Sequence, residues 1–174
     1  MIYFTSDLHL YHKNIIEYAH RPFETVEEMN ETIIHNINTE VSKNDFLFIL
    51  GDFCFLSVKQ SIKQLKRIRC NNIVFTQGNH DQRRLINRIR EETDKKIVTH
   101  YINERPTMNV GGTTLLYNHI PVPDIPKIDY INLHGHIHTE GHYSIINKGY
   151  YDVGVDNNEF KPISMRKIRE INNF

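Results

Sequence analysis

The segment DFLFILGD, residues 45–52, is a short apolar run that stops at a glycine and an aspartate. Its length and its β-favouring side chains predict a buried strand, and the glycine marks the turn that ends it. Similar runs occur in IYFTSD, residues 2–7, and in NIVFTQGN, residues 72–79. Each run therefore predicts a strand that is followed at its carboxyl end by a polar side chain.

Helical patterns follow these three predicted strands. Residues 25–41 carry apolar side chains at helical spacing and begin with the capping-box pair Thr25 and Glu28. Ser57 begins a second predicted helix, and residues 82–92 form a third. This alternation predicts an α/β fold with parallel strands, in which ligands bind at the carboxyl ends of the strands.

The second half of the chain consists of short strand-like runs that turn residues separate. These runs are KIVTHYI (96–102), TMNVGGTTLLY (107–117), INLHGHIH (131–138), YSIIN (143–147) and YYDVGV (150–155). The glycine pair inside the second run predicts a hairpin, and the pattern favours a mostly antiparallel or mixed sheet. The proline-rich segment 120–130 is predicted to be a surface loop, and Ser164 to begin a terminal helix.

Size and charge limit the class of protein. With 174 residues, 39% of them apolar, the chain suits one hydrophobic core, so we expect a single domain over residues 1–174. The 21 basic and 21 acidic side chains cancel, so the net charge supports neither a nucleic-acid nor a membrane partner. Without a signal-peptide pattern or a membrane-length apolar run, the protein is expected to be cytoplasmic. Cys54 and Cys70 match no common zinc motif and are expected to be reduced packing residues.

Metal-ligating side chains follow most of the predicted strands. They are Asp7, His9, Asp52, Asn79, His80, Asp81, His119, His136 and His138. Carboxylate, amide and imidazole donors without a thiolate suit Mn²⁺, Fe or Zn²⁺ better than Ca²⁺ or a cysteine-type zinc site. The donors exceed the needs of one tetrahedral ion and suffice for two ions that share a carboxylate, as in phosphatases and nucleases.

Five short motifs occur in a fixed order along the chain. They are SDLH (6–9), GD (51–52), GNHD (78–81), YNH (117–119) and GHIH (135–138). This ordered set resembles the five-part signature of the calcineurin-like metallophosphoesterase superfamily, over at least residues 3–138. Asn118 departs slightly from that signature, which more often has Ser or Gly before the histidine. The resemblance implies an α/β fold in which two mixed β-sheets are sandwiched between helices.

The resemblance also implies a role for each motif residue. The ligands implied for one metal ion are Asp7, His9, Asp52 and His138. Those implied for the second ion are Asp52, Asn79, His119 and His136, so that Asp52 bridges the pair. A metal-bound hydroxide would attack phosphorus, His80 would assist the leaving group, and Asp81 would orient His80. Two divalent ions are expected, with Mn first and Fe, Zn or Ni as alternatives.

Four further residues have two interpretations each. His12 and Arg21 are candidates for substrate contact, but His12 also fits a solvated loop residue and Arg21 a surface arginine. His134 has no place in the signature and is expected to be structural or to support a ligand. His142 follows a glycine turn, where it is either a substrate contact or a bystander.

The spacing of the motifs favours a phosphodiester substrate. Few residues separate His80, His119 and His136, so no large domain can cover the site, and an open site suits small diesters. A nuclease acting on DNA or RNA ends is the alternative enzyme, but the neutral charge gives it little support. A protein-binding scaffold of the same fold would have no use for His80 and a full ligand set. A protein phosphatase is disfavoured because GDFCF, residues 51–55, lacks the Asp-Arg-Gly that often follows the GD motif in that branch.

Overall fold

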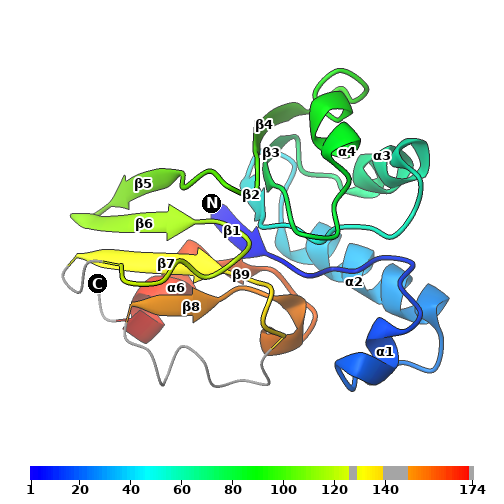
Figure 1. Ribbon diagram of the computed structural model, residues 1–174, viewed down its shortest axis with the longest axis horizontal. Helices are drawn as coiled ribbons and strands as arrows, with labels where there is room; N and C mark the ends of the chain where they lie inside the picture. Colours follow the sequence, from blue (N-terminus) through cyan, green and yellow to red (C-terminus); the bar gives the residue numbers. More distant parts are fainter. Residues whose placement is uncertain (126–128, 139–148, 173–174) are drawn as a thin grey trace.

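A computed structural model describes residues 1–125, 129–138 and 149–172 of the chain. The first of its two sheets has the strand order β4-β3-β2-β1-β9, in which β1 to β4 are parallel and β9 is antiparallel to β1 (Figure 1). Its strands are β1 (Ile2–Thr5), β2 (Phe46–Ile49), β3 (Asn72–Thr76), β4 (Lys96–His100) and β9 (Ile163–Ser164). The three predicted parallel strands are therefore confirmed.

The second sheet has the strand order β5-β6-β7-β8. Its strands are β5 (Thr107–Val110), β6 (Thr113–Tyr117), β7 (Tyr130–His134) and β8 (Tyr150–Asp152). The β5–β6 pair is the predicted glycine hairpin, while β6, β7 and β8 are parallel, so the sheet is mixed. The predicted run at residues 143–147 lies outside the described residues.

One strand was assigned to the wrong sheet. Residues 96–102 were expected to begin the second sheet, whereas β4 pairs in parallel with β3 of the first. The physical reason is that α4 (Arg83–Arg88) provides the crossover that a third parallel pair requires. The sequence pattern of a five-residue strand does not indicate which sheet it joins.

The helices largely match the sequence patterns. They are α1 (Ile15–Tyr18), α2 (Val26–Glu40), α3 (Val58–Arg67), α4 (Arg83–Arg88), the 3₁₀ turn η1 (Val155–Asn157) and α6 (Met165–Asn172). At the start of α2, the Thr25 hydroxyl accepts a hydrogen bond from the backbone N–H of Glu28 at 3.1 Å. The Glu28 carboxylate accepts from the backbone N–H of Glu24 at 3.0 Å, one residue earlier than a standard capping box. Within the described ranges, no helix has the length and apolar character needed to cross a bilayer.

The core consists of two hydrophobic clusters on opposite faces of the first sheet. One lies between this sheet and helices α2, α3 and α4, and includes Tyr3, Ile33 and Leu65. The other lies between the two sheets, includes Phe4 and Leu133, and extends to α6. Because neighbouring residues of β1 belong to different clusters, both faces of the strand are buried. This double burial explains why the strands have continuous apolar runs instead of alternating ones.

The parallel arrangement brings the loops of both sheets to one edge. The backbone N–H of Asp7 donates to the carbonyl of Gly51 at 3.1 Å, and that of His9 donates to the carbonyl of Asp52 at 2.9 Å. In the second sheet, the N–H of Gly135 donates to the carbonyl of His119 at 3.0 Å. These bonds join the SDLH loop to the GD loop, and the YNH loop to the GHIH loop, beyond the strand ends.

Candidate metal centre

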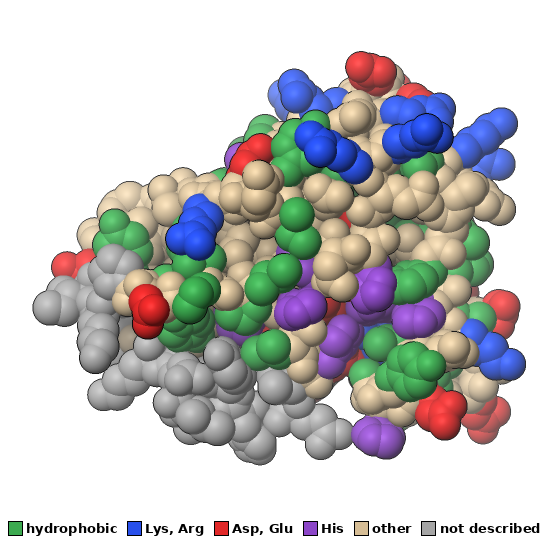
Figure 2. Space-filling view, viewed as in Figure 1, with side chains coloured by type: hydrophobic (Ala, Val, Ile, Leu, Met, Phe, Trp, Pro, Cys, Tyr) green, Lys and Arg blue, Asp and Glu red, His purple; other side chains and the backbone are tan. Residues whose placement is uncertain are grey.

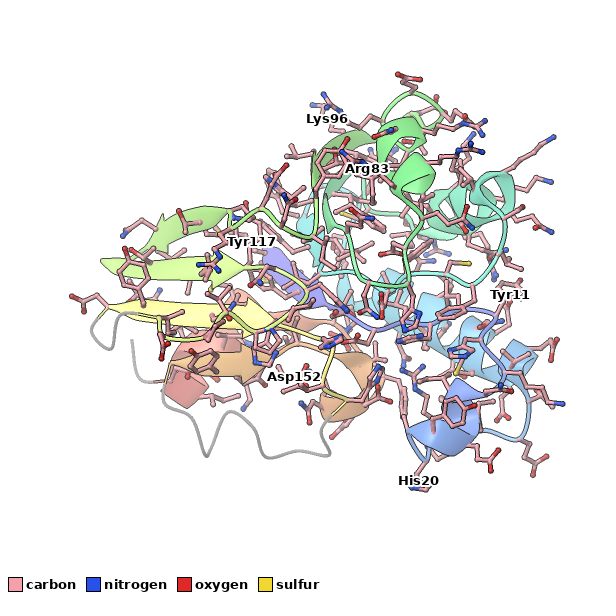
Figure 3. The ribbon with its side chains drawn as sticks, in the orientation of Figure 1. Tyr11, His20, Arg83, Lys96, Tyr117 and Asp152 are labelled. Carbon is pink, nitrogen blue, oxygen red and sulfur yellow. The ribbon has the colours of Figure 1, made fainter. Side chains whose placement is uncertain are left out.

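The predicted ligands of the first ion converge on one point. Single ligand atoms of Asp7, His9 and His138 all lie within 4.8 Å of one another. The Nε2 atoms of His9 and His138 are 3.2 Å apart, and the Nε2 of His138 lies 3.8 Å from Asp7 Oδ1. Figure 3 shows nitrogen- and oxygen-bearing side chains in the region between the labelled Tyr11 and Asp152. Residues 129 positions apart thus contribute to a single cluster.

The predicted ligands of the second ion lie beside the first group. The side-chain oxygen of Asn79 is 2.7 Å from His119 Nε2 and 2.9 Å from His136 Nδ1. Asp7, Asp52 and His119 form a further group whose ligand atoms lie within 4.8 Å of one another. The Oδ2 atom of Asp52 is 3.5 Å from the Nε2 of His9 and 3.5 Å from that of His119. The Asp52 carboxylate therefore lies between His9, a predicted ligand of the first ion, and His119, a predicted ligand of the second.

The backbone at the site has an unusual conformation. Five of the seven predicted metal ligands have positive φ angles: Asp7 (55°), His9 (48°), Asp52 (52°), His136 (74°) and His138 (44°). Positive φ is uncommon for residues other than glycine and is concentrated at functional sites, where the surrounding fold sustains the strain. Here it allows the chain to turn sharply after each strand and to aim successive side chains at one point.

Two motif glycines allow the close approach of these loops. A Cβ atom at Gly135 would lie 2.1 Å from Ser6 Oγ and 2.2 Å from Asp7 Oδ2. A Cβ atom at Gly78 would lie 2.1 Å from Asp52 Oδ1. Because any larger residue would collide with a predicted ligand, the glycines of the GNHD and GHIH motifs have a steric function.

Hydrogen bonds fix two of the imidazole rings. The Nδ1 of His119 lies 2.8 Å from the carbonyl oxygen of Leu50, which directs its Nε2 toward the cluster. The Nδ1 of His138 lies 2.9 Å from the carboxylate of Asp156. A carboxylate or carbonyl on the outer nitrogen of a histidine fixes its tautomer and orientation for metal binding. Sequence reasoning missed Asp156, whose only signal is its position directly after the run YYDVGV.

The substrate prediction for Arg21 is corrected by the structure. Arg21 is 4% exposed, and its guanidinium forms two bonds to the Asp156 carboxylate, at 2.7 and 2.9 Å. It also donates to the carbonyls of Asp7 and Leu8, at 2.7 and 3.0 Å. The side chain is thus neither a phosphate ligand nor a surface group, because all of these partners hold it inside the protein.

The role predicted for Asp81 is revised as well. Its carboxylate accepts hydrogen bonds from the backbone N–H groups of Asp52, Phe53 and Gly78, at 2.8, 3.1 and 2.9 Å. Burial raises the pKa of Asp81 to about 6, although the backbone donors lower it. Both of its oxygens are engaged with backbone, so Asp81 joins the GD and GNHD loops instead of orienting His80.

His80 and His12 lie at the exposed side of the cluster. The His80 side chain is 49% exposed, and its Nε2 lies 4.0 Å from Asp52 Oδ2. Its backbone N–H donates to Asp52 Oδ1 at 2.9 Å, which ties the His80 loop to the carboxylate between the two groups. The ring of His12 stacks on Phe55, a residue that sequence reasoning did not select. Figure 2 shows histidine side chains gathered on this face of the molecule.

The two remaining histidines have different outcomes. His134 is fully buried, and its Nδ1 lies 3.0 Å from the carbonyl oxygen of Gly135, in accord with a structural or supporting residue. His142 lies outside the described residues. Cys54 and Cys70, predicted to be reduced packing residues, are buried free thiols.

Charge balance in the cluster fits cation binding. Burial lowers the pKa of His9 to about 2, so this ring is neutral and its lone pair can bind a metal. Burial also disfavours a proton on His119, but Asp52 and Asp7 outweigh it and raise the pKa of His119 to about 9. Burial likewise disfavours the charged form of Asp52, yet His119 lowers its pKa to about 2. The carboxylates thus attract a positive charge, and a divalent cation would supply the charge that a proton on His119 supplies.

Known proteins resemble this chain over most of its length. The model of the family described as calcineurin-like phosphoesterase matches residues 1–167. An uncharacterized protein of Methanocaldococcus jannaschii, MJ1445, is 32% identical over 170 residues, which cover 94% of this chain and 86% of the relative. The Gene 66 protein of Mycobacterium phage L5 is 36% identical over 88 residues, 49% of this chain and 42% of the relative. The crystal structure of AQ665 from Aquifex aeolicus, a protein of unknown function, has a TM-score of 0.75 and 25% identity, with 98% of each chain covered.

Proposed function

The chain belongs to the calcineurin-like phosphoesterase family, and on that premise we propose that it hydrolyses phosphodiesters with two divalent cations. The observation that carries the proposal is the position of Asp52, whose Oδ2 lies 3.5 Å from a ring nitrogen in each of the two groups. A carboxylate placed in this way can serve two ions at once. Two-metal sites stabilise both the attacking and the leaving oxygen of a phosphoryl group.

Each cation would have its own ligand set. The first would be held by Asp7, His9, Asp52 and His138, and the second by Asp52, Asn79, His119 and His136. When bound, the cations supply electrophilic activation of the phosphate and of a water molecule. The mixture of imidazole, carboxylate and amide oxygen suits Mn²⁺ first, with Fe, Zn²⁺ and Ni²⁺ as alternatives.

His80 would protonate the leaving oxygen. Its ring is half-exposed, and its backbone is anchored to Asp52, so an incoming substrate can reach it beside the bridging carboxylate. A proton from an imidazole prevents the departing alcohol from leaving as a high-energy alkoxide. Asp81 supports this step indirectly, because it holds the loop that carries His80 against the GD loop.

The contacts of Arg21 support a diester over a monoester. A monoester dianion carries more charge than a diester and usually benefits from a guanidinium fork. Arg21, the arginine that the sequence offered for this purpose, is bound to Asp156 inside the protein. A small diester, with a single negative charge and two ester groups, is the better match for the open, histidine-lined site.

Metal reconstitution tests the proposal. The metal-free protein is loaded with Mn²⁺, Ni²⁺ or Zn²⁺, and hydrolysis of bis(4-nitrophenyl) phosphate and 4-nitrophenyl phosphate is compared. We expect turnover with metal only, a higher kcat/KM for the diester, and a loss of about 10²–10⁴-fold in kcat for His80→Ala.

A matched variant and a metal count complete the test. His35→Ala removes an exposed histidine on α2 and is expected to leave kcat and KM unchanged. Asp52→Asn is expected to reduce the bound metal, measured by elemental analysis, below that of the wild type. Absence of turnover with all three metals would refute the proposed activity, and full metal content in Asp52→Asn would refute the bridging assignment.

A further inference from the structure

An aromatic surface adjoins the metal cluster on the side of His80. The rings of His12 and Phe55 are nearly parallel, with centroids 3.9 Å apart and an interplanar angle of 10°. The Phe55 ring is also 5.2 Å from that of His9 and 5.1 Å from that of His80. The rings of Tyr18 and His12 form a T-shaped contact, with centroids 6.3 Å apart and an interplanar angle of 74°. We call the rings of His12, Tyr18 and Phe55 the aromatic shelf.

The shelf is exposed although two of its rings are apolar. Phe55 is 36% exposed and Tyr18 is 68% exposed. Figure 2 shows hydrophobic side chains next to the histidines on this face. Burying such rings would release water from apolar surface, so their exposure beside a polar site is unfavourable without a ligand.

Backbone contacts tie the shelf to the metal-binding loop. The backbone N–H of Phe55 donates to the carbonyl of Leu10 at 2.8 Å, and that of His12 donates to the carbonyl of His9 at 3.0 Å. A parallel bridge pairs Leu10 with Cys54. The shelf is therefore positioned relative to His9, and a ligand resting on it would lie at a defined distance from the cluster.

We propose that the aromatic shelf binds the base of a nucleoside that leaves the phosphodiester during hydrolysis. The inference rests on the proposed function, in which His80 gives its proton to the leaving oxygen. Because the Phe55 ring adjoins His80, the alcohol that receives this proton lies over Phe55. In the step itself, water oxygen bonds to phosphorus and releases a proton to solvent, while the bond from phosphorus to the nucleoside oxygen breaks. That oxygen takes the proton of His80, which regains one from solvent.

The chemistry of the shelf selects a planar, π-rich group. Aromatic rings prefer offset stacking or edge contacts with other rings, and nucleobases stack on exposed aromatic side chains without needing sequence-specific hydrogen bonds. An alkyl alcohol such as glycerol or choline has no flat face and would leave the rings of Phe55 and Tyr18 in water. The base of the leaving alcohol would therefore determine which diesters bind well, and Phe55 is the residue on which it stacks.

A pair of diesters isolates this effect. One is a dinucleoside monophosphate, and the other is the same molecule with an abasic ribose on the leaving side. The leaving oxygen is the same in both, so a difference in kcat/KM reports binding of the base. For wild-type enzyme we expect the complete dinucleoside to have a kcat/KM about tenfold higher, as base stacking on one aromatic ring would give.

Variants of Phe55 assign the preference to the shelf. Phe55→Leu is expected to lower the ratio of the two kcat/KM values from about ten to near one, a ratio in which any change common to both diesters cancels, and Phe55→Tyr is expected to retain the ratio. Phe46→Leu is the matched control, because Phe46 is 50% exposed at the opposite end of β2 from Asp52. Phe46→Leu should leave the kcat/KM values of both the complete and the abasic diester unchanged. A single-stranded oligonucleotide with the same terminal dinucleoside distinguishes a nucleic-acid end from a small molecule as the source of the nucleoside.

The outcomes separate this inference from the proposed function. A wild-type enzyme that turns over both diesters equally, or a Phe55→Leu variant that slows both to the same degree, overturns the nucleoside site alone. Turnover of neither diester, nor of bis(4-nitrophenyl) phosphate, overturns the proposed function and the inference together.

Discussion

Asp156 has no motif around it, yet it positions a predicted ligand. Its carboxylate contacts Nδ1 of His138 on one side and is bound by the buried guanidinium of Arg21 on the other. Arg21 in turn donates to the backbone carbonyl of Asp7. One ion pair therefore links the backbone of one predicted ligand with the ring of another.

Replacing Asp156 by Asn should weaken metal binding more than it changes the fold. The amide has the size of the carboxylate but lacks its charge, so the His138 ring loses its fixed tautomer. Loss of such a partner typically lowers metal affinity by about 10–100-fold. Isothermal titration calorimetry of the metal-free protein with Mn²⁺ measures the metal affinity. The titration is carried out well below the melting temperature, so that the variant is folded.

Glu159→Gln provides the comparison for that measurement. Glu159 lies near Asp156 in the sequence and allows the same replacement of a carboxylate by an amide. Its side chain, however, is 87% exposed. We expect its metal affinity to equal that of the wild type. Equal affinity in Asp156→Asn as well would mean that Asp156 serves only as the partner of Arg21.

At the residue scale, the sequence predicts candidate ligands but not the residues that contact them. Asp7, Asp52 and Asn79 are predicted as ligands because each belongs to a short motif after an apolar run. Arg21 and Asp156 were misread or missed because they are 135 positions apart and only the fold brings them together. Phe55 was missed for a similar reason, since its exposure beside His80 depends on loops from different strands.

At the element scale, α2 offers a direct test of how local chemistry stabilises the fold. Its first turn is capped by the Thr25 hydroxyl, which accepts from the backbone of Glu28. Thr25→Ala leaves that N–H without a partner from the protein, and such substitutions lower the free energy of unfolding by about 1 kcal/mol. Urea denaturation followed by circular dichroism measures the loss, and kcat should not change.

Thr39 is the internal control in the same helix. Its hydroxyl bonds to the carbonyl of His35 at 2.9 Å, a group that already belongs to the helix. Thr39→Ala should therefore leave stability unchanged or raise it slightly, because alanine has the higher helix propensity. If both variants lose the same stability, the cap makes no special contribution.

The elements that were predicted well have both a start signal and a pattern. For α2, the cap residue Thr25 and the apolar spacing agree. For α4, the apolar spacing continues through residues 82–92, but the helix ends at Arg88. There the backbone N–H groups of Glu91 and Glu92 both donate to the carbonyl of Arg88. Periodicity alone does not determine where a helix ends, and the assignment of β4 to a sheet failed for the same lack of a local signal.

At the scale of the whole molecule, the candidate site connects the two sheets. Asp7 and Asp52 follow strands of the first sheet, while His119 and His138 follow strands of the second. In each of two groups, Asp7 with His9 and His138, and Asp7 with Asp52 and His119, ligand atoms from loops of both sheets lie within 4.8 Å of one another. Binding of cations there would require the native arrangement of both sheets, which the unfolded chain does not have.

Metal removal should therefore lower the melting temperature of the entire protein. A ligand that binds only the native state adds about 2.7 kcal/mol to stability when its concentration is one hundred times its Kd. For a chain of this size, each kcal/mol corresponds to about 2–4 °C, so the expected shift is roughly 5–10 °C. Differential scanning calorimetry with excess Mn²⁺ or excess chelator measures it. Asp52→Asn, which removes the carboxylate charge proposed to serve both ions, should show a smaller shift than the wild type. An equal melting temperature with and without metal would mean that cations do not bind to the native state at this edge.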